Sequence, residues 1–249
     1  YQKQISNLLN KVNRVFNLND KWFQIQMEEL YSYLPPLDLF SHKEKKLDQW
    51  QIDIFKMIDR KENVIIVAKT SSGKTVCSTY VVFKNNKVLY VLPTAELARQ
   101  VAGILRNTLN GNVILITNKE KFIESDSYKV VVGTPYALEN FIIANYKSLN
   151  FDYVVYDEIH QVNEDEGDSL QRIIQLLDCN FLALSATVEN PEDLKNWWSE
   201  IKQKPVNLVI HDTRFIVQQR YIWNNNKLEI LHPMSAVNLD YIKSNGLIN

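Results

Sequence analysis

Hydrophobic and polar positions follow two different periods along this chain. Between residues 5 and 34 the apolar side chains recur at helical spacing, and Pro35-Pro36 then ends the pattern because proline cannot continue a helix. A further amphipathic helix is predicted from about Glu44 to Asp59. We therefore expect a small N-terminal helical segment at residues 1–43, in front of the main domain.

From residue 64 onwards, short apolar runs alternate with longer amphipathic segments. The runs are rich in Val and Ile and do not alternate strictly, which is typical of strands buried on both faces of a parallel sheet. The longer segments have the length of crossover helices. Strands are expected at 64–67, 88–92, 113–116, 130–132, 153–156 and 181–184, and helices at 74–83, 94–109, 134–144, 166–177 and 191–199. The pattern predicts an α/β fold with a mostly parallel sheet flanked by helices, whose ligands bind beyond the carboxyl ends of the strands.

Two more apolar stretches, at 206–210 and 215–223, follow Pro205 and lead into an asparagine run. We interpret them as one or two closing strands and a turn. The main domain is thus expected at residues 44–223, and residues 224–249 are expected to be a tail or linker.

Composition narrows the class of protein without naming an activity. Lys+Arg number 28 and Asp+Glu 29, so the net charge of -1 gives no sign of nucleic-acid binding, and any basic surface would have to be local. Cys77 and Cys179 are too far apart for a metal knuckle, and two free thiols suit a reducing, intracellular compartment. No stretch approaches the ~18 consecutive apolar residues that a membrane span needs.

The turn between the first predicted strand and its helix has the composition of a phosphate-binding loop. Ala68-Lys69-Thr70-Ser71-Ser72-Gly73-Lys74-Thr75 follows the pattern G-x-x-x-x-G-K-[ST], with Ala68 in place of the first glycine. Backbone N–H groups at a helix N-terminus surround a phosphate in such loops. Lys74, which we expect to face solvent, would reach the β- and γ-phosphates, and Thr75 would offer its hydroxyl to Mg²⁺. The alternative is a chance strand-to-helix turn.

Two acidic residues follow a buried strand at Asp157-Glu158-Ile159-His160. Unpaired charge is costly to bury, so two carboxylates at a strand end require an explanation. Asp157 is suited to hold Mg²⁺ through a water molecule, and Glu158 to orient or deprotonate an attacking water. His160 is open to two interpretations, as a hydrogen-bonded structural residue or as a catalytic one.

Three further clusters have both a functional and a structural interpretation. Ser185-Ala186-Thr187 places two hydroxyls after the next strand, although small polar residues also simply form loops. Trp197-Trp198 could stack on bases, but at the end of an amphipathic helix we interpret both as packing residues. Glu164-Asp165-Glu166, with Asp168, could be a metal cluster; we interpret it instead as a solvated acidic loop that caps the next helix.

The order of these segments resembles the superfamily 2 helicases, specifically the DExH-box group. Ala68–Thr75 is similar to motif I, Pro93–Gln100 to motif Ia, Gly133-Thr134-Pro135 to motif Ib, Asp157–His160 to the DExH box, Ser185–Thr187 to motif III, and Trp50-Gln51 to the adenine-reading Q motif. The resemblance covers about residues 45 to 223, which corresponds to the first of the family's two RecA-like domains. The phosphate loop and Asn190-Pro191-Glu192-Asp193-Leu194 most resemble the Ski-like branch, which includes antiviral and large-DNA-virus relatives.

The resemblance implies a P-loop NTPase fold of the RecA-like type, ATP and Mg²⁺ as cofactors, and roles for individual residues. The residues that would hold the nucleotide are Gln51, Thr70, Ser71, Ser72, Gly73, Lys74 and Thr75. Mg²⁺ would be held by Thr75 and Asp157. The catalytic residues would be Lys74, Asp157, Glu158 and His160. One nucleic-acid strand would be contacted by Pro93, Thr94, Arg99, Gly133 and Thr134, and coupled to the nucleotide site by Ser185 and Thr187, with His160. Small side chains and backbone N–H groups can contact phosphates, so a chain without excess positive charge can bind a strand.

The family's second RecA-like domain supplies arginine fingers, and no matching motif follows Thr187. We therefore expect the ATP-binding half of a helicase or translocase that acts on single-stranded or partly duplex RNA or DNA, with a second RecA-like domain as partner and no membrane. One alternative is a non-catalytic nucleic-acid-binding scaffold or sensor, against which the intact Lys74, Thr75, Asp157 and Glu158 argue. Another is a small-molecule kinase, against which the order of the motifs argues.

Overall fold

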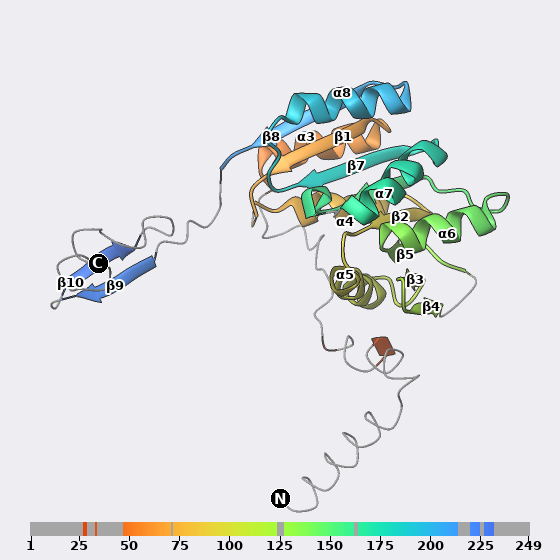
Figure 1. Ribbon diagram of the computed structural model, residues 1–249, viewed down its shortest axis with the longest axis horizontal. Helices are drawn as coiled ribbons and strands as arrows, with labels where there is room; N and C mark the ends of the chain where they lie inside the picture. Colours follow the sequence, from red (N-terminus) through yellow and green to blue (C-terminus); the bar gives the residue numbers. More distant parts are fainter. Residues whose placement is uncertain are drawn as a thin grey trace, which may run out of the picture. The chain divides into compact units, whose positions relative to one another are not determined.

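Figure 1 shows the computed structural model, which describes residues 27–28, 33, 47–70, 72–123, 127–161, 164–213, 220–224 and 227–231. The chain divides into two compact units, Tyr1–Thr213 and Arg214–Asn249. Most of the expected N-terminal helical segment (1–43), the Pro35-Pro36 boundary and residues 232–249 of the expected tail lie outside the described residues.

An eight-stranded sheet forms the centre of the first unit, in the order β4-β3-β5-β2-β6-β7-β1-β8. Its strands are β1 (Asn63–Ala68), β2 (Val88–Val91), β3 (Val113–Ile116), β4 (Lys121–Ile123), β5 (Val130–Gly133), β6 (Tyr153–Tyr156), β7 (Asn180–Ser185) and β8 (Val206–His211). All neighbouring strands pair in parallel except β3 and β4, which are antiparallel. The mostly parallel sheet is confirmed, and β4 adds an edge strand that the sequence did not predict.

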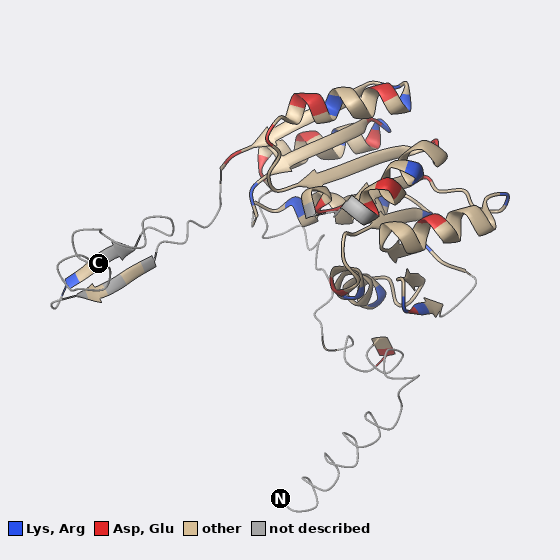
Figure 2. Cartoon of the chain, in the orientation of Figure 1, with Lys and Arg blue, Asp and Glu red and all other residues tan. Residues whose placement is uncertain are grey.

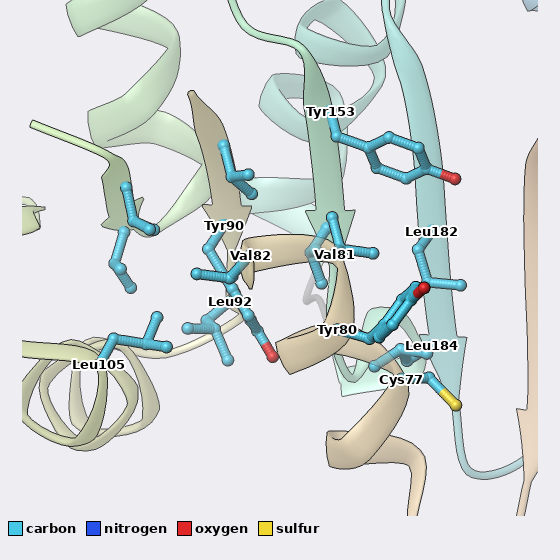
Figure 3. Close-up of a cluster of buried hydrophobic side chains, with 14 of the residues drawn as sticks. Cys77, Tyr80, Val81, Val82, Tyr90, Leu92, Leu105, Tyr153, Leu182 and Leu184 are labelled. Atoms are coloured by element: carbon cyan, nitrogen blue, oxygen red, sulfur yellow. The ribbon is translucent and has the colours of Figure 1, made fainter. Parts of the chain in front are cut away.

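Helices cover both faces of this sheet (Figure 1). They are α3 (Gln49–Asp59), α4 (Lys74–Lys84), α5 (Ala95–Thr108), α6 (Pro135–Asn145), α7 (Glu164–Leu176) and α8 (Pro191–Lys202). Helices α3, α4 and α5 bury one apolar cluster, part of which is drawn in Figure 3, and α6, α7 and α8 bury another on the opposite face. No helix in the described part of the chain is long and apolar enough to cross a membrane.

Helix α3 begins at Gln49, later than the predicted start at Glu44. Asp48 is the N-cap, and the side chains of Asp48 and Gln51 form a capping box with the first turn of the helix. Such a box satisfies backbone N–H groups that lack an intrahelical partner, which fixes the helix start.

Five parallel strands place all the expected site segments except Trp50-Gln51, which lies on α3, at one edge of the sheet. Strands β5, β2, β6, β7 and β1 are consecutive neighbours, and the chain leaves each of them at the same edge. The segments that follow begin at Thr134, Leu92, Asp157, Ala186 and Lys69. This is the edge at which open α/β sheets bind their ligands.

The second unit contains an antiparallel hairpin, formed by β9 (Arg220–Asn224) and β10 (Lys227–Leu231). Strand β9 pairs with β10, so residues 220–223 belong to this hairpin. The apolar stretch at 215–223 alone does not reveal its pairing partner, which is why residues 220–223 were expected at the end of the main domain.

Candidate functional site

The phosphate loop connects β1 to α4, and Gly73 is the N-cap of that helix. Gly73 has φ 93°, in the left-handed region that L side chains rarely adopt. A Cβ atom at Gly73 would also lie 2.6 Å from the side-chain nitrogen of Gln51. The left-handed backbone therefore favours glycine at this position, and a larger residue would also displace the end of the Gln51 side chain.

Lys74 does not face solvent as the sequence suggested; only 7% of it is exposed. Its ammonium group donates to the carbonyl of Ala68 at 2.6 Å and, more weakly, to that of Lys69 at 3.4 Å. Burial lowers the pKa of Lys74, and the nearby carboxylates of Glu158 and Asp157 oppose that change. The difference arises because the loop folds back over its own lysine, which a linear motif does not show.

The remaining loop residues differ in exposure. Thr70 is exposed, whereas Ser72 is buried and its hydroxyl has no hydrogen-bond partner. Ser71 lies outside the described residues. Because an unpaired buried hydroxyl is costly, the Ser72 hydroxyl fits a loop that hydrogen-bonds a phosphate oxygen.

Gln51 links α3 to the phosphate loop. Its side-chain oxygen accepts from the Asp48 backbone N–H at 3.0 Å, and its Nε2 donates to the carbonyl of Gly73 at 3.3 Å. These two bonds leave one N–H of the amide and one lone pair of its oxygen for another partner.

The acidic pair at the end of β6 is held by several hydrogen bonds. Glu158 has φ 49°, an unusual value for a residue with a side chain, and its N–H donates to Oδ1 of Asp157 at 2.9 Å. Tyr90 of β2 donates to Oδ2 of Asp157 at 2.9 Å. Burial raises the pKa of Asp157 to about 6, and the Tyr90 hydrogen bond opposes that rise. A cation beside Asp157 would offset the cost of burying its charge.

Tyr90 is a neighbour of the acidic pair that the sequence pattern did not predict. It is buried within the apolar run of β2, and its hydroxyl also lies 3.0 Å from that of Ser78 on α4. Ser78 in turn contacts the carbonyl of Thr75 at 3.0 Å. A chain of hydroxyl contacts therefore connects Asp157 to the start of α4.

His160 contacts both the acidic pair and the segment that follows β7. Its Nδ1 lies 3.3 Å from Oε2 of Glu158, and 3.3 Å from both the Ser185 hydroxyl and the Ala186 backbone nitrogen. The Ser185 hydroxyl also lies 3.2 Å from the carbonyl of Thr187, whose side chain is exposed. Ser185 and His160 are thus in contact, and Thr187 contacts Ser185 only through its backbone carbonyl.

A cavity of about 210 Å³ opens beside these residues. Its polar lining includes Thr75, Tyr90, Asp157 and Glu158, and α5 supplies an apolar wall with Leu97 and other residues. Hydroxyl and carboxylate oxygens are the hard ligands that Mg²⁺ prefers, so Thr75 and Asp157 form a donor set that fits this ion.

Three of the residues expected to contact nucleic acid lie at the start of α5. Pro93 is buried, and the hydroxyl of Thr94 accepts from the Leu97 N–H at 3.3 Å as the N-cap of the helix. Arg99 is paired with Glu120 at 2.7 Å, and less than a fifth of either side chain is exposed. Burial of Pro93, the helix cap of Thr94 and the ion pair of Arg99 therefore give each residue a place in the domain that does not depend on a nucleic-acid strand.

The other two expected contacts, Gly133 and Thr134, lie between β5 and α6. A Cβ atom at Gly133 would lie 2.1 Å from the carbonyl oxygen of Ile116 on β3. Thr134 is buried, and its hydroxyl donates to Oδ1 of Asn118 at 3.4 Å. Steric demands of the sheet therefore explain the glycine without reference to nucleic acid.

The tryptophan pair and the acidic cluster differ in how far their structural interpretations hold. Trp198 is 1% exposed and packs against Tyr156 and Phe181, which confirms it as a packing residue, whereas Trp197 is 37% exposed. Glu166 lies inside α7 and binds the backbone of α6, so its interpretation as part of a solvated loop was wrong. Among the described residues, no group of three or more His, Cys, Asp or Glu side chains could hold a metal ion.

Residues 48–194, more than half of the chain, match the family model described as DEAD/DEAH box helicase. The chain belongs to this family. Its relatives include the probable ATP-dependent RNA helicase DDX60-like of Homo sapiens, 29% identical over 170 residues that make up 62% of this chain and 10% of that protein. The antiviral helicase SKI2 of Saccharomyces cerevisiae is 26% identical over 208 residues, with 80% of this chain and 16% of that protein covered. The ATP-dependent DNA helicase MER3 of the same yeast is 29% identical over 195 residues, covering 68% and 16%.

Solved structures of helicases share the fold. The helicase MrfA bound to DNA superposes with a TM-score of 0.58 at 24% identity, over 70% of this chain and 27% of that one. A hypothetical ATP-dependent RNA helicase from Sulfolobus tokodaii gives a TM-score of 0.55 at 23% identity, over 67% and 53%. The family model and the curated relatives confirm the expected superfamily 2 membership, and the solved structures confirm the RecA-like fold. This DEAD/DEAH box domain spans only 10% to 16% of the length of the three curated relatives named above.

Proposed function

We propose that this chain is the ATP-binding half of an ATP-dependent helicase or translocase that acts on RNA or DNA. The convergence of Lys74, Thr75, Asp157 and Glu158 at one edge of the sheet, in a member of a helicase family, carries the proposal. These are the side-chain types that phosphoryl transfer requires, since its catalysis consists mainly of positioning and charge stabilisation.

The phosphate loop would bind the nucleotide through its backbone N–H groups and through Ser72. To reach the β- and γ-phosphates, the Lys74 ammonium has to exchange its bonds to the carbonyls of Ala68 and Lys69 for phosphate oxygens. Thr75 and Asp157 would hold Mg²⁺, which when bound neutralises charge on the phosphate oxygens.

Gln51 would select adenine with the two hydrogen-bonding positions that its contacts to Asp48 and Gly73 leave over. The edge of adenine that carries N6 and N7 offers one donor and one acceptor, which match them. Because Gln51 also binds the Gly73 carbonyl, adenine recognition and the phosphate loop would be mechanically connected.

Glu158 would orient or deprotonate the attacking water. His160, which contacts both Glu158 and Ser185, would connect that step to the segment that follows β7. The Nδ1 atom of His160 can donate to Glu158 or accept from the Ala186 N–H, but it cannot do both. The tautomer of His160 would therefore determine whether its Nδ1 atom bonds to Glu158 or to the Ala186 N–H.

The strand would pass the segments after β2 and β5, with Thr94, Arg99 and Thr134 near its backbone. The named relatives include a probable RNA helicase and a DNA helicase, which supports a nucleic acid as the substrate class. Contacts to phosphates do not distinguish the two sugars. We further propose that a second RecA-like domain completes the site and that the protein is intracellular, as its two free cysteines suggest.

The binding of a fluorescent ATP analogue with Mg²⁺ tests the nucleotide site directly. We expect Lys74→Ala to weaken binding about 10- to 100-fold, since a hydrogen bond to a charged group contributes about 1.5 to 3 kcal/mol. Lys84→Ala, at the opposite end of the same helix, is the control and should bind normally. Unchanged affinity in Lys74→Ala would remove the basis for the nucleotide site. Strand binding without nucleotide binding by the unaltered chain would favour a non-catalytic sensor.

A further inference from the structure

The N-terminus of α6 is occupied by a carboxylate from another helix. Oε2 of Glu166, on α7, accepts a hydrogen bond from the Tyr136 backbone N–H at 2.7 Å. Pro135 is the first residue of α6 and has no N–H, so Tyr136 provides the first amide donor of this helix. The Glu166 carboxylate therefore takes the position where an external anion would first meet the helix.

The second oxygen of the same carboxylate is also engaged. Oε1 of Glu166 accepts from the side-chain nitrogen of Asn118 at 3.1 Å. The side-chain oxygen of Asn118 accepts from the Thr134 hydroxyl at 3.4 Å. Asn118 thus joins Glu166 to Thr134, the residue that precedes α6. Two donors of this turn, the Thr134 hydroxyl and the Tyr136 N–H, are therefore hydrogen-bonded within the chain.

A carboxylate and a phosphate have the same preference for this position. Both are anions that accept from backbone N–H groups, and the dipole of a helix stabilises negative charge at its N-terminus. The turn Thr134-Pro135-Tyr136 belongs to the segment proposed to contact the nucleic-acid backbone. A phosphate and the Glu166 carboxylate cannot share one N–H, and their like charges repel at that distance.

We infer that Glu166 is an internal competitor of nucleic-acid phosphate at the N-terminus of α6, and that it must leave before a strand can bind there. This inference rests on the proposed nucleic-acid-binding function. Glu166 thus has a regulatory contact. In the free protein its carboxylate occupies the Tyr136 N–H, and this lowers the affinity of the protein for any strand, whatever the sequence of that strand.

Fluorescence anisotropy with a labelled oligouridylate or oligodeoxythymidylate tests this competition in the whole chain. Glu166→Gln keeps the length of the side chain and an oxygen that can accept from Tyr136, but it removes the charge that imitates a phosphate. We expect this variant to bind either strand about two- to fivefold more tightly, the range that a charge at a helix N-terminus provides. Asp168→Asn is the matched control, since Asp168 is an exposed acid on the same helix and its substitution alters the net charge equally.

The control separates local competition from a general loss of negative charge. Equal affinity of Glu166→Gln and Asp168→Asn, or weaker binding by Glu166→Gln, would overturn the inference. If Glu166 only capped α6, Glu166→Gln would lower the melting temperature without tighter strand binding. Melting curves of the same samples therefore distinguish that structural role from competition. If the unaltered chain and both variants bind no strand at all, the proposed function fails, and the inference fails with it.

Discussion

At the scale of single residues, the carboxylate of Asp157 lies at the end of β6 between the Tyr90 hydroxyl and the Glu158 backbone. Burial raises its pKa to about 6, above the value of 3.8 for a free aspartate. A carboxyl whose pKa is higher in the folded than in the unfolded protein gives up its proton more readily on unfolding. Above about pH 6 the ionised group therefore favours the unfolded state.

We predict that Asp157→Asn stabilises the domain at pH 8 while it removes Mg²⁺-dependent nucleotide binding. The asparagine oxygen can accept from the Glu158 N–H, and its nitrogen can donate to Tyr90, which then donates to Ser78. Residue 157, Tyr90 and Ser78 would each keep a hydrogen-bond partner, and the buried negative charge at position 157 would be removed. The expected gain is about 1 to 3 kcal/mol, given that one pKa unit corresponds to about 1.4 kcal/mol.

Urea unfolding with a chelator present measures this gain, and the exposed Asp168→Asn should leave the unfolding free energy within about 0.5 kcal/mol of the original. A less stable Asp157→Asn protein would show that the carboxylate is held by favourable contacts that outweigh its burial.

The motifs in the sequence identified the residue types of the site but not their surroundings. Lys74 was expected in solvent because a linear pattern does not show that the loop closes over its lysine. Tyr90 was taken as one member of an apolar run, since its hydroxyl finds Asp157 only after β2 and β6 become neighbours. Glu166 was interpreted as part of a solvated acidic loop, because its contact with α6 joins residues far apart in the sequence.

At the scale of elements, Gly133 has a steric role that can be tested apart from any ligand. We predict that Gly133→Ala destabilises the domain by about 1 to 3 kcal/mol, because its Cβ would meet the Ile116 carbonyl at 2.1 Å and force β3 and β5 apart. Gly167→Ala on α7 is the control, since nothing lies within 4 Å of a Cβ at that position. Alanine there should stabilise the helix by about 0.5 to 1 kcal/mol. If the unfolding midpoints of Gly133→Ala and Gly167→Ala shifted equally in the same direction, the steric role of Gly133 would be contradicted.

The two adjacent tryptophans of α8 provide a second prediction at this scale. Trp198 is fully buried beside Tyr156 and Phe181, so Trp198→Ala should cost about 3 to 5 kcal/mol through the cavity it leaves. Trp197 is more than a third exposed, and Trp197→Ala should cost less than about 1 kcal/mol. Chemical denaturation of both variants measures the difference, and similar losses would show that α8 is not anchored through Trp198.

Elements buried on both faces were the most predictable part of the fold. The apolar runs at 64–67 and 153–156 became β1 and β6 with nearly the same bounds, because burial on both sides demands apolar residues throughout. Strand β4 has only three residues and buries only Phe122, too short a pattern to detect. The start of α3 depends on the capping box at Asp48, which is a matter of side-chain geometry rather than of periodicity.

At the scale of the whole molecule, the proposed site has an acidic and phosphate-binding wall but needs further positive charge. During phosphoryl transfer an arginine commonly stabilises the charge that develops on the γ-phosphate. Arg60 is paired with Glu62, Arg99 with Glu120 and Arg172 with Glu139, while Arg106 donates to the carbonyl of Met27. These four side chains are thus engaged with other parts of the domain, and a second RecA-like domain is the proposed source of the missing arginine.

We therefore predict that this chain alone binds ATP with Mg²⁺ but turns it over slowly. Without an arginine at the γ-phosphate, hydrolysis should be about a thousandfold slower than in a completed site, the lower limit of what such an arginine contributes. Phosphate release measured with and without an oligonucleotide, on a sample whose nucleotide binding has been verified, gives the rate. Glu158→Gln supplies the background, since it keeps the fold and removes the proposed base. Rapid strand-stimulated turnover well above that background would mean that the chain completes its own site, and an arginine of this chain would then have to be sought beside Glu158.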